Sequence, residues 1–226
     1  SVDPSLPALG NGRHEWRGFI PRRAHPQAVN PRGGLLLNWN NKPAARFGAA
    51  DDQFSYGSVQ RVDLFRGLGA KVSLERLVGV MNRAATQDLR AVEVWPRIAA
   101  VLARGRAPDA RTARAAELVT EWRRGGSSRL DRDLDGRIDA PGAAVLDAAW
   151  DGLADAVLRP ALGPLTRQLA TVQRRDNPPS PQGSAYGGGW YGYVDKDLRR
   201  LLGMRVRGRY SRPYCGKGRR AACARS

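Results

Sequence analysis

The chain has 226 residues, of which 42% are hydrophobic, and this composition is typical of a globular protein and excludes a largely disordered one. Its 38 Lys and Arg residues outnumber 21 Asp and Glu residues, which gives a formal net charge of +17. The arginines are scattered and no nucleic-acid-binding motif accompanies them, so we expect no specific nucleic-acid partner. No apolar run approaches the length of a membrane span, so we expect no membrane partner either.

The first segment, residues 1–70, is expected to be associated with a β-sheet. Residues 1–32 are rich in Pro, Gly and Arg, which favours extended chain and turns. The sequence GGLLLNWNNKPA at residues 33–44 then predicts a short buried strand over residues 34–40. This strand ends in asparagines, which commonly end strands and cap turns but can also stabilise an oxyanion through their side-chain NH2 groups. The pattern alone leaves both interpretations open.

The second segment, residues 71–175, is predicted to be helical. The helical pattern begins at Ser73, and Pro96 is expected to interrupt or restart it. Further helices are expected over residues 110–124, 143–158 and 161–174. Pro160 is expected to close the middle one of these. The predicted apolar faces are Leu74, Leu77, Val78 and Met81 in the first helix, Ala115, Leu118, Val119 and Trp122 in the second, and Leu146, Trp150, Leu153 and Val157 in the third.

The last segment, residues 176–226, is predicted to contain a loop rich in Gly and aromatic residues, a helix near residues 196–202 and a basic C-terminal tail. Seven residues separate Cys215 from Cys223 in a glycine-containing loop, a span that a disulfide can close. A disulfide would fit an oxidising compartment, and a pair of free thiols is the alternative.

Familiar catalytic arrangements are not indicated. His14 and His25 lie in loops rich in Pro and Arg, and the chain has no Gly-x-Ser-x-Gly motif, so a Ser-His-Asp triad is not expected. Cys215 has no neighbouring base to activate it as a nucleophile. The two His and two Cys residues also lack the spacing of a zinc site.

The sequence DRDLDGRID at residues 131–139 has the pattern of a calcium-binding loop. Its acidic residues fall at four ligand positions of such a loop: Asp131, Asp133, Asp135 and Asp139. Gly136 occupies the sharp turn, but the twelfth position is Gly142 where a bidentate Glu is usual, so any calcium affinity is expected to be weak. The alternative is an acidic, solvated loop that caps the helix starting near Pro141.

Two stretches of the first segment resemble the β-chain of the penicillin acylase family of N-terminal-nucleophile amidohydrolases. They are DPSLPALGNGRHEWRGFIP at residues 3–21 and AVNPRGGLLLNWNNKPA at residues 28–44. QDLRAVEVWPRI at residues 87–98 and YGGGWYGYVDKDLR at residues 186–199 are similar to actinobacterial members of the same family. The resemblance covers most of the chain. It implies an α+β fold, the αββα sandwich of these hydrolases, to which this chain would contribute mostly helices and a few strands.

The resemblance also implies a mechanism. In this family an N-terminal serine attacks an amide carbonyl and its own α-amine is the base, so no catalytic histidine is required. An Asn side chain and a backbone N–H stabilise the oxyanion, and Asn40 matches that asparagine. Arg61 is the closest match to an arginine that orients the site. The family's structural calcium would have Asp51 and Pro4 among its ligands, with the others outside this chain.

Ser1 is not expected to be the nucleophile, because SVDPSLP is similar to an internal stretch of the family's β-chain. The resemblance therefore implies the C-terminal portion of an amidohydrolase. Its partners would be a small-molecule amide substrate and the remainder of the acylase, namely the α-chain and the N-terminal part of the β-chain. The full-length protein is expected to be secreted or extracytoplasmic. The alternatives are an inactive truncated fragment and a basic binding module without catalysis.

Overall fold

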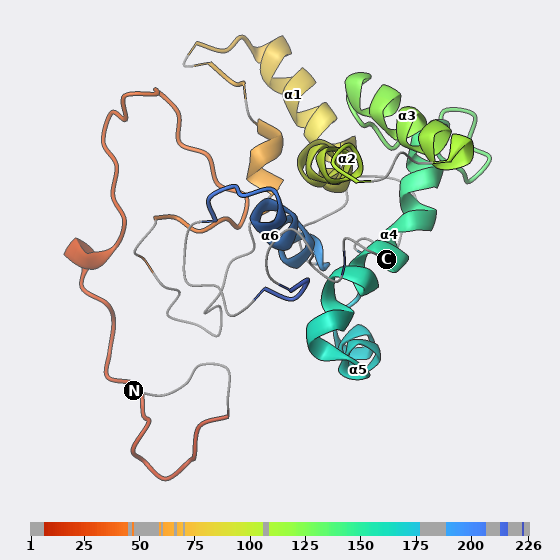
Figure 1. Ribbon diagram of the computed structural model, residues 1–226. Coiled ribbons are helices and arrows are strands. Elements are labelled where there is room, and N and C mark those ends of the chain that lie inside the picture. The colour runs from red at the N-terminus through yellow and green to blue at the C-terminus, as the bar shows by residue number, and fades with distance from the viewer. Residues whose placement is uncertain are drawn as a thin grey trace.

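The computed structural model of the chain describes residues 7–44, 47, 59, 61–65, 67–69, 71–105, 109–176, 189–206, 213–216 and 223. Over these residues the chain is mostly helical, as predicted. Figure 1 shows the helices gathered together, with an extended N-terminal segment running apart from them. The β pairing in the described ranges is limited to an isolated antiparallel bridge between Gln87 and Ser128. None of the helices in these ranges is both long enough and apolar enough to span a bilayer.

The α-helices in the described ranges are α1 (Leu74–Thr86), α2 (Trp95–Leu102), α3 (Ala110–Arg124), α4 (Pro141–Leu162), α5 (Leu165–Val172) and α6 (Tyr191–Leu201). Two short 3-10 turns, η1 (Arg22–Ala24) and η2 (Arg61–Phe65), precede them. A π-helical turn, η3 (Arg90–Val94), leads directly into α2. Pro96 lies in the first turn of α2, where a missing N–H costs no helical hydrogen bond. The interruption comes earlier than predicted, since α1 ends at Thr86 and helical turns resume at Arg90.

Side-chain caps begin two of the helices. The Ser73 hydroxyl accepts a hydrogen bond from the backbone N–H of Arg76 at 3.2 Å and so begins α1. The Asp109 carboxylate accepts one from the N–H of Thr112 at 2.8 Å and begins α3. Each cap satisfies an N–H that has no partner inside its own helix, which explains why both helices start where they do.

The prediction that Pro160 closes the third helix is wrong, because α4 continues to Leu162. The φ of proline is compatible with a helix, so one proline near the end removes a single backbone hydrogen bond without forcing the chain out. Gly163 ends the helix instead. It has a φ of 54°, and its N–H donates to the carbonyl oxygen of Arg159 at 2.8 Å.

The strand predicted over residues 34–40 is also absent. Residues 35–37 are irregular, and Leu36 and Leu37 are exposed. A strand exists only when a neighbouring strand satisfies its backbone N–H and C=O groups. The described part of the chain provides no such neighbour, so the αββα sandwich is not seen in it.

Helix α1 is confirmed, but its predicted core face is wrong. The four residues of that face are exposed, from 43% for Leu77 to 72% for Leu74. Val80 and Ala84 are buried instead, and α1 packs against η2. Because α1 has apolar residues on two sides, its periodicity predicts a helix without specifying which side faces the core.

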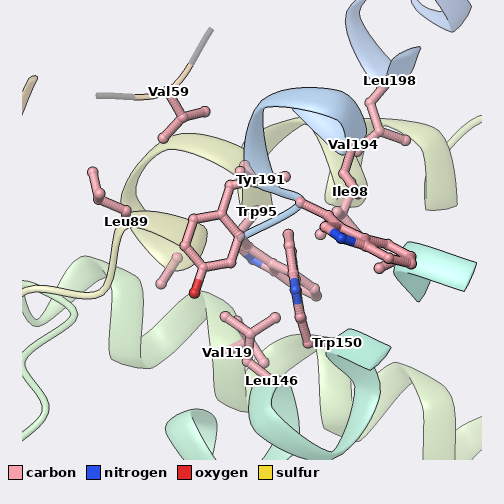
Figure 2. Packing of buried hydrophobic residues seen from close by; sticks show 14 of the residues in the cluster. Val59, Leu89, Trp95, Ile98, Val119, Leu146, Trp150, Tyr191, Val194 and Leu198 are labelled. Atoms are coloured by element: carbon pink, nitrogen blue, oxygen red, sulfur yellow. The ribbon is translucent and has the colours of Figure 1, made fainter. Parts of the chain in front are cut away.

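Helices α3 and α4 form the centre of the fold. The predicted face of α4 is confirmed, with Leu153 half-buried against the core, whereas on α3 only Val119 and Trp122 of the predicted face are buried. In Figure 2, Trp150 of α4 lies against Tyr191 at the start of α6. The two rings meet edge to face with centroids 5.0 Å apart. The Trp150 indole N–H donates to the carbonyl oxygen of Arg175 at 2.7 Å, and that of Trp190 donates to Gln173 at 3.1 Å. Both buried indoles therefore have their polar atom satisfied.

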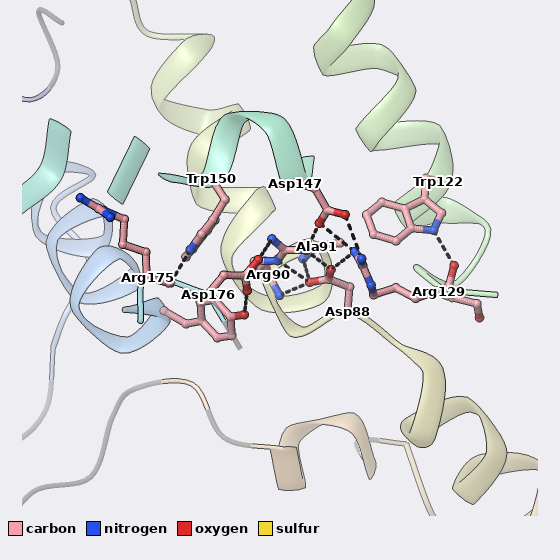
Figure 3. Close-up of polar contacts among 11 residues, drawn as sticks. Asp88, Arg90, Ala91, Trp122, Arg129, Asp147, Trp150, Arg175 and Asp176 are labelled. Atoms are coloured by element: carbon pink, nitrogen blue, oxygen red, sulfur yellow. Dashed lines mark hydrogen bonds and ion pairs between the residues drawn. The ribbon is translucent and has the colours of Figure 1, made fainter. Parts of the chain in front are cut away.

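A buried ionic network lies beside this core (Figure 3). The Arg90 side chain is 1% exposed, and its guanidinium lies 2.5 Å from Asp88, 2.5 Å from Asp147 and 2.6 Å from Asp176. Arg129 donates to Asp147 at 2.8 Å and to Asp88 at 3.1 Å. The network thus connects η3, the segment before α4, α4 itself and the segment after α5.

We expect Gly142→Ala to destabilise the chain by about 1–3 kcal/mol, through a clash between α3 and α4. A Cβ at residue 142 would lie 2.5 Å from the carbonyl oxygen of Leu118 and 2.7 Å from the Cβ of Trp122. Gly152→Ala on the same helix is the matched control, since a Cβ there meets nothing within 4 Å. It should stabilise by about 0.5–1 kcal/mol. Urea unfolding of both variants measures the difference, and equal midpoints would contradict this packing.

We expect stability to fall below about pH 4 because of Asp88. Burial, the largest single influence, would raise the pKa of Asp88, but the charges of Arg90 and Arg129 and the hydrogen bonds from Arg90 together outweigh it and hold the pKa below its usual value. A carboxylate with a lowered folded-state pKa stabilises the fold above its unfolded pKa, and this contribution is lost as pH falls through the folded pKa. Asp88→Asn should lower the free energy of unfolding by about 3 kcal/mol at pH 7. The loss of stability at acid pH should then be smaller in this variant than in the unmodified chain.

Urea unfolding at a series of pH values tests this expectation. Asp151→Asn is the control, since Asp151 is exposed on α4 outside the network. If the free energy of unfolding falls equally steeply at acid pH in Asp88→Asn and in the unmodified chain, Asp88 is not the cause of that fall.

Candidate active site

Asparagine side chains shape the turn at residues 38–41. The Asn38 side-chain oxygen accepts a hydrogen bond from the N–H of Asn40 at 2.9 Å, and that of Asn41 accepts one from the N–H of Trp39 at 3.0 Å. These bonds hold Asn40 in the left-handed region with a φ of 60°, a conformation that asparagine tolerates better than most residues. The turn therefore presents the Asn40 side chain in a fixed direction.

Arg61 of η2 reaches this turn from 21 residues further along the chain. Its Nη2 donates a hydrogen bond to Oδ1 of Asn40 at 2.5 Å. The guanidinium also lies over the Trp39 ring, 5.0 Å from the centroid, and Trp39 packs on Phe65 with centroids 5.2 Å apart. The structure thus brings the two candidate catalytic residues, Asn40 and Arg61, together on an aromatic support.

The pairing has a chemical consequence for Asn40. A guanidinium can only donate, so it selects the oxygen end of the amide and leaves the NH2 end pointing the other way. In the described part of the chain no acceptor engages that NH2 group. The positive charge at Oδ1 also polarises the amide and makes its NH2 group a stronger donor. An oriented, uncharged donor of this kind suits the stabilisation of an oxyanion.

The residue spacing gives no signal for the part played by Trp39. Its stacking with Arg61 becomes visible only when η2 is placed beside the asparagine turn. The candidate calcium ligands Asp51 and Pro4, and also Ser1, lie outside the described residues.

The acidic loop brings three of its four predicted ligands together. One carboxylate oxygen each from Asp131, Asp133 and Asp139 lie within 4.8 Å of one another, whereas Asp135 is not part of this group. The Asp131 carboxylate accepts hydrogen bonds from the N–H groups of Asp135 at 3.1 Å and Gly136 at 2.9 Å. The group can hold a metal ion.

The alternative role for this loop, capping α4, is wrong. Ala140 occupies the capping position of α4 and provides no side-chain hydrogen bond. The carboxylate of Asp139 turns instead toward Arg132, whose guanidinium it meets at 3.1 Å.

The two cysteines form a disulfide, with a distance of 5.0 Å between the Cα atoms of Cys215 and Cys223. Cys215 is tied to α6. The N–H of Cys215 donates to the Asp197 carboxylate at 2.7 Å, and the buried ammonium of Lys196 lies 2.9 Å from the same carboxylate. Lys196 also lies over the Tyr214 ring, 4.4 Å from its centroid. The free-thiol alternative is therefore wrong.

Comparison with known proteins identifies the class of protein. Residues 1–194 match the family described as penicillin amidase. The chain is 31% identical to penicillin G acylase of Escherichia coli over 150 residues, which are 64% of this chain and 17% of that protein. It is 49% identical to penicillin acylase 2 proenzyme of Pseudomonas sp. (strain SE83) over 41 residues, which are 18% of this chain and 5% of that protein.

These matches identify the family of the chain. The chain belongs to the penicillin amidase family, and the resemblance predicted from the sequence is confirmed. It spans 17% or less of the length of each of these two relatives.

Proposed function

We propose that this chain supplies the oxyanion-binding asparagine of an acylase that hydrolyses a small-molecule amide. The observation that carries the proposal is the hydrogen bond from Arg61 to Asn40, which directs the Asn40 NH2 group outward. As the amide carbonyl is attacked, its oxygen gains negative charge, and a preoriented NH2 donor stabilises that charge more than it stabilises the neutral ground state. Arg61 is a positioning residue in this scheme because it acts through Asn40.

The nucleophile in this proposal is an N-terminal serine outside this chain, with its α-amine as the base. Asn40 is one of two oxyanion donors, and a backbone N–H is the other. The match covers only 17% of the length of the Escherichia coli relative, so most of an acylase of that length would lie outside this chain. This supports a nucleophile that is not part of this chain. The α-chain and the N-terminal part of the β-chain would provide the sheets of the αββα sandwich. Residues 1–70, 71–175 and 176–226 would form its sheet-associated, helical and C-terminal parts.

We further propose that the protein is secreted or extracytoplasmic. The disulfide between Cys215 and Cys223 supports this location, since structural disulfides persist mainly in oxidising compartments. Cys215 is tied to α6, because its N–H donates to the Asp197 carboxylate that also pairs with the buried Lys196.

Weak calcium binding by the acidic loop is a second proposal. Carboxylate oxygens are the ligands that calcium prefers, and three of them converge from Asp131, Asp133 and Asp139. The twelfth loop residue, Gly142, is buried between α3 and α4 and offers no side-chain oxygen.

In the acylase that contains this chain, Asn40→Gly should lower kcat by about 10²–10³ and leave KM nearly unchanged. Glycine adopts the φ of 60° at this position without strain, so the loss reports the missing NH2 donor and not a distorted turn. Initial rates of amide hydrolysis over a range of substrate concentrations measure both constants.

Asn82→Ala is the matched control for this experiment, because Asn82 is exposed on α1, away from the asparagine turn. It should leave kcat unchanged. Arg61→Met should lower kcat less than Asn40→Gly, since the donor remains but loses its orientation. An Asn40→Gly enzyme of normal kcat would rule out the oxyanion role, and an acylase with no amidase activity before mutation would favour an inactive chain.

For the acidic loop, calorimetric titration with calcium should give a Kd on the order of 10⁻⁴–10⁻³ M. Asp133→Asn should weaken binding, because Asp133 is one of the three converging carboxylates. Asp151→Asn removes the same charge from an exposed position on α4 and should leave the Kd unchanged. No heat of binding at millimolar calcium would refute the site.

A further inference from the structure

The N-terminal segment, residues 7–37, is an arm that exposes large apolar side chains. Trp16 is 76% exposed, Phe19 88% and Val29 86%. The full set with exposed side chains is Leu9, Trp16, Phe19, Ile20, Val29, Leu36 and Leu37. Figure 1 shows the arm extending away from the helices. Apolar surface on this scale is unfavourable in water and marks a surface that another molecule covers.

The arm has a defined local shape despite its exposure. The rings of Trp16 and Phe19 meet edge to face, 5.1 Å apart. The Trp16 indole donates to the carbonyl oxygen of Gly18 at 2.5 Å, and the side chain of Gln27 donates to that of Arg22 at 2.8 Å. A preshaped aromatic pair loses little conformational entropy when it docks, and Trp is enriched among the residues that dominate binding energy.

The arm leads directly into the candidate active site. It is followed by the asparagine turn, which Trp39 and Arg61 attach to η2. A molecule that covers the arm therefore also lies next to Asn40. Under the proposed function, the nucleophilic serine also approaches Asn40 from outside this chain.

Charge argues against a second copy of this chain as the partner. Residues 7–37 contain five arginines and one glutamate, and the whole chain carries +17. Two such arms would repel each other, whereas an acidic surface around an apolar groove would attract one. The remainder of the acylase is a protein part of sufficient size, since this chain spans 17% of its Escherichia coli relative.

We propose that residues 7–37 dock in an apolar, acid-rimmed groove on the remainder of the acylase, and that this docking sets Asn40 opposite the nucleophile. The inference rests on the proposed function. It adds the interface and identifies Trp16 and Phe19 as its central contacts.

Hydroxyl-radical footprinting read by mass spectrometry tests the interface. The samples are the isolated 226-residue chain and the acylase purified from its source with this chain in it. Oxidation of Trp16 and Phe19 should fall at least tenfold in the acylase. Val172, which is 82% exposed at the end of α5, is the reference residue and should be oxidised equally in both samples. Equal oxidation of Trp16 and Phe19, a free 24.7 kDa monomer in the source, or protection by self-association of the isolated chain would each overturn the proposal.

The double variant Trp16→Ala/Phe19→Ala tests the link to Asn40. It should lower kcat at least tenfold in the acylase and leave the helical circular dichroism of the isolated chain unchanged, whereas Val172→Ala should change neither. Trp16→Phe should retain most of the activity. If Asn40→Gly has normal kcat while the arm is protected, the proposed function fails and the interface stands. If Asn40→Gly is impaired while the arm stays oxidised, the interface fails alone.

Discussion

The buried guanidinium of Arg90 is the interaction on which the helical part of this chain depends. Its charge is balanced by Asp88 just before η3, Asp147 on α4 and Asp176 after α5. A buried charge that loses its partners costs several kcal/mol, so these segments cannot separate without a large penalty. Arg90 also lies over the Trp150 ring, 5.6 Å from its centroid, which couples the ionic network to the aromatic core. One side chain therefore determines where three segments distant in sequence meet.

The same network holds the first residue of η3, Arg90. Residues two positions apart on a regular helix face different sides, yet Asp88 and Arg90 contact each other. They can do so because Asp88 lies before the turn and its carboxylate accepts the N–H of Arg90 at 2.8 Å. The guanidinium then folds back to the same carboxylate. Since η3 continues into α2, and α2 packs on α6, the network also determines where the C-terminal helix lies.

Sequence-based prediction succeeded in this protein where the interactions are between neighbours in sequence, and it failed where they are between distant residues. Local signals sufficed for the start of α1 after Ser73, for the extent of α3 and for the core face of α4, where apolar residues occupy one side. They failed for α1 and for the strand over residues 34–40, which depend on what lies beside them in space. The site shows the same division. The asparagine turn forms from neighbours in sequence, whereas the contact of Arg61 with Asn40 spans 21 residues and was expected only from family resemblance.

Different contacts determine the direction of the Asn40 NH2 group and its position relative to the nucleophile. Two hydrogen bonds within the asparagine turn, the bond from Arg61 and the stacking on Trp39 all lie inside this chain, so the direction of the Asn40 amide does not depend on a partner. Its position relative to an external nucleophile has no such internal support, because the arm before it packs on little of the described chain. A catalytic donor must be held within a fraction of an ångström of the reacting oxygen. The arm would bury its apolar side chains only in the assembled acylase. Assembly itself would then fix the position of Asn40 relative to the reacting oxygen.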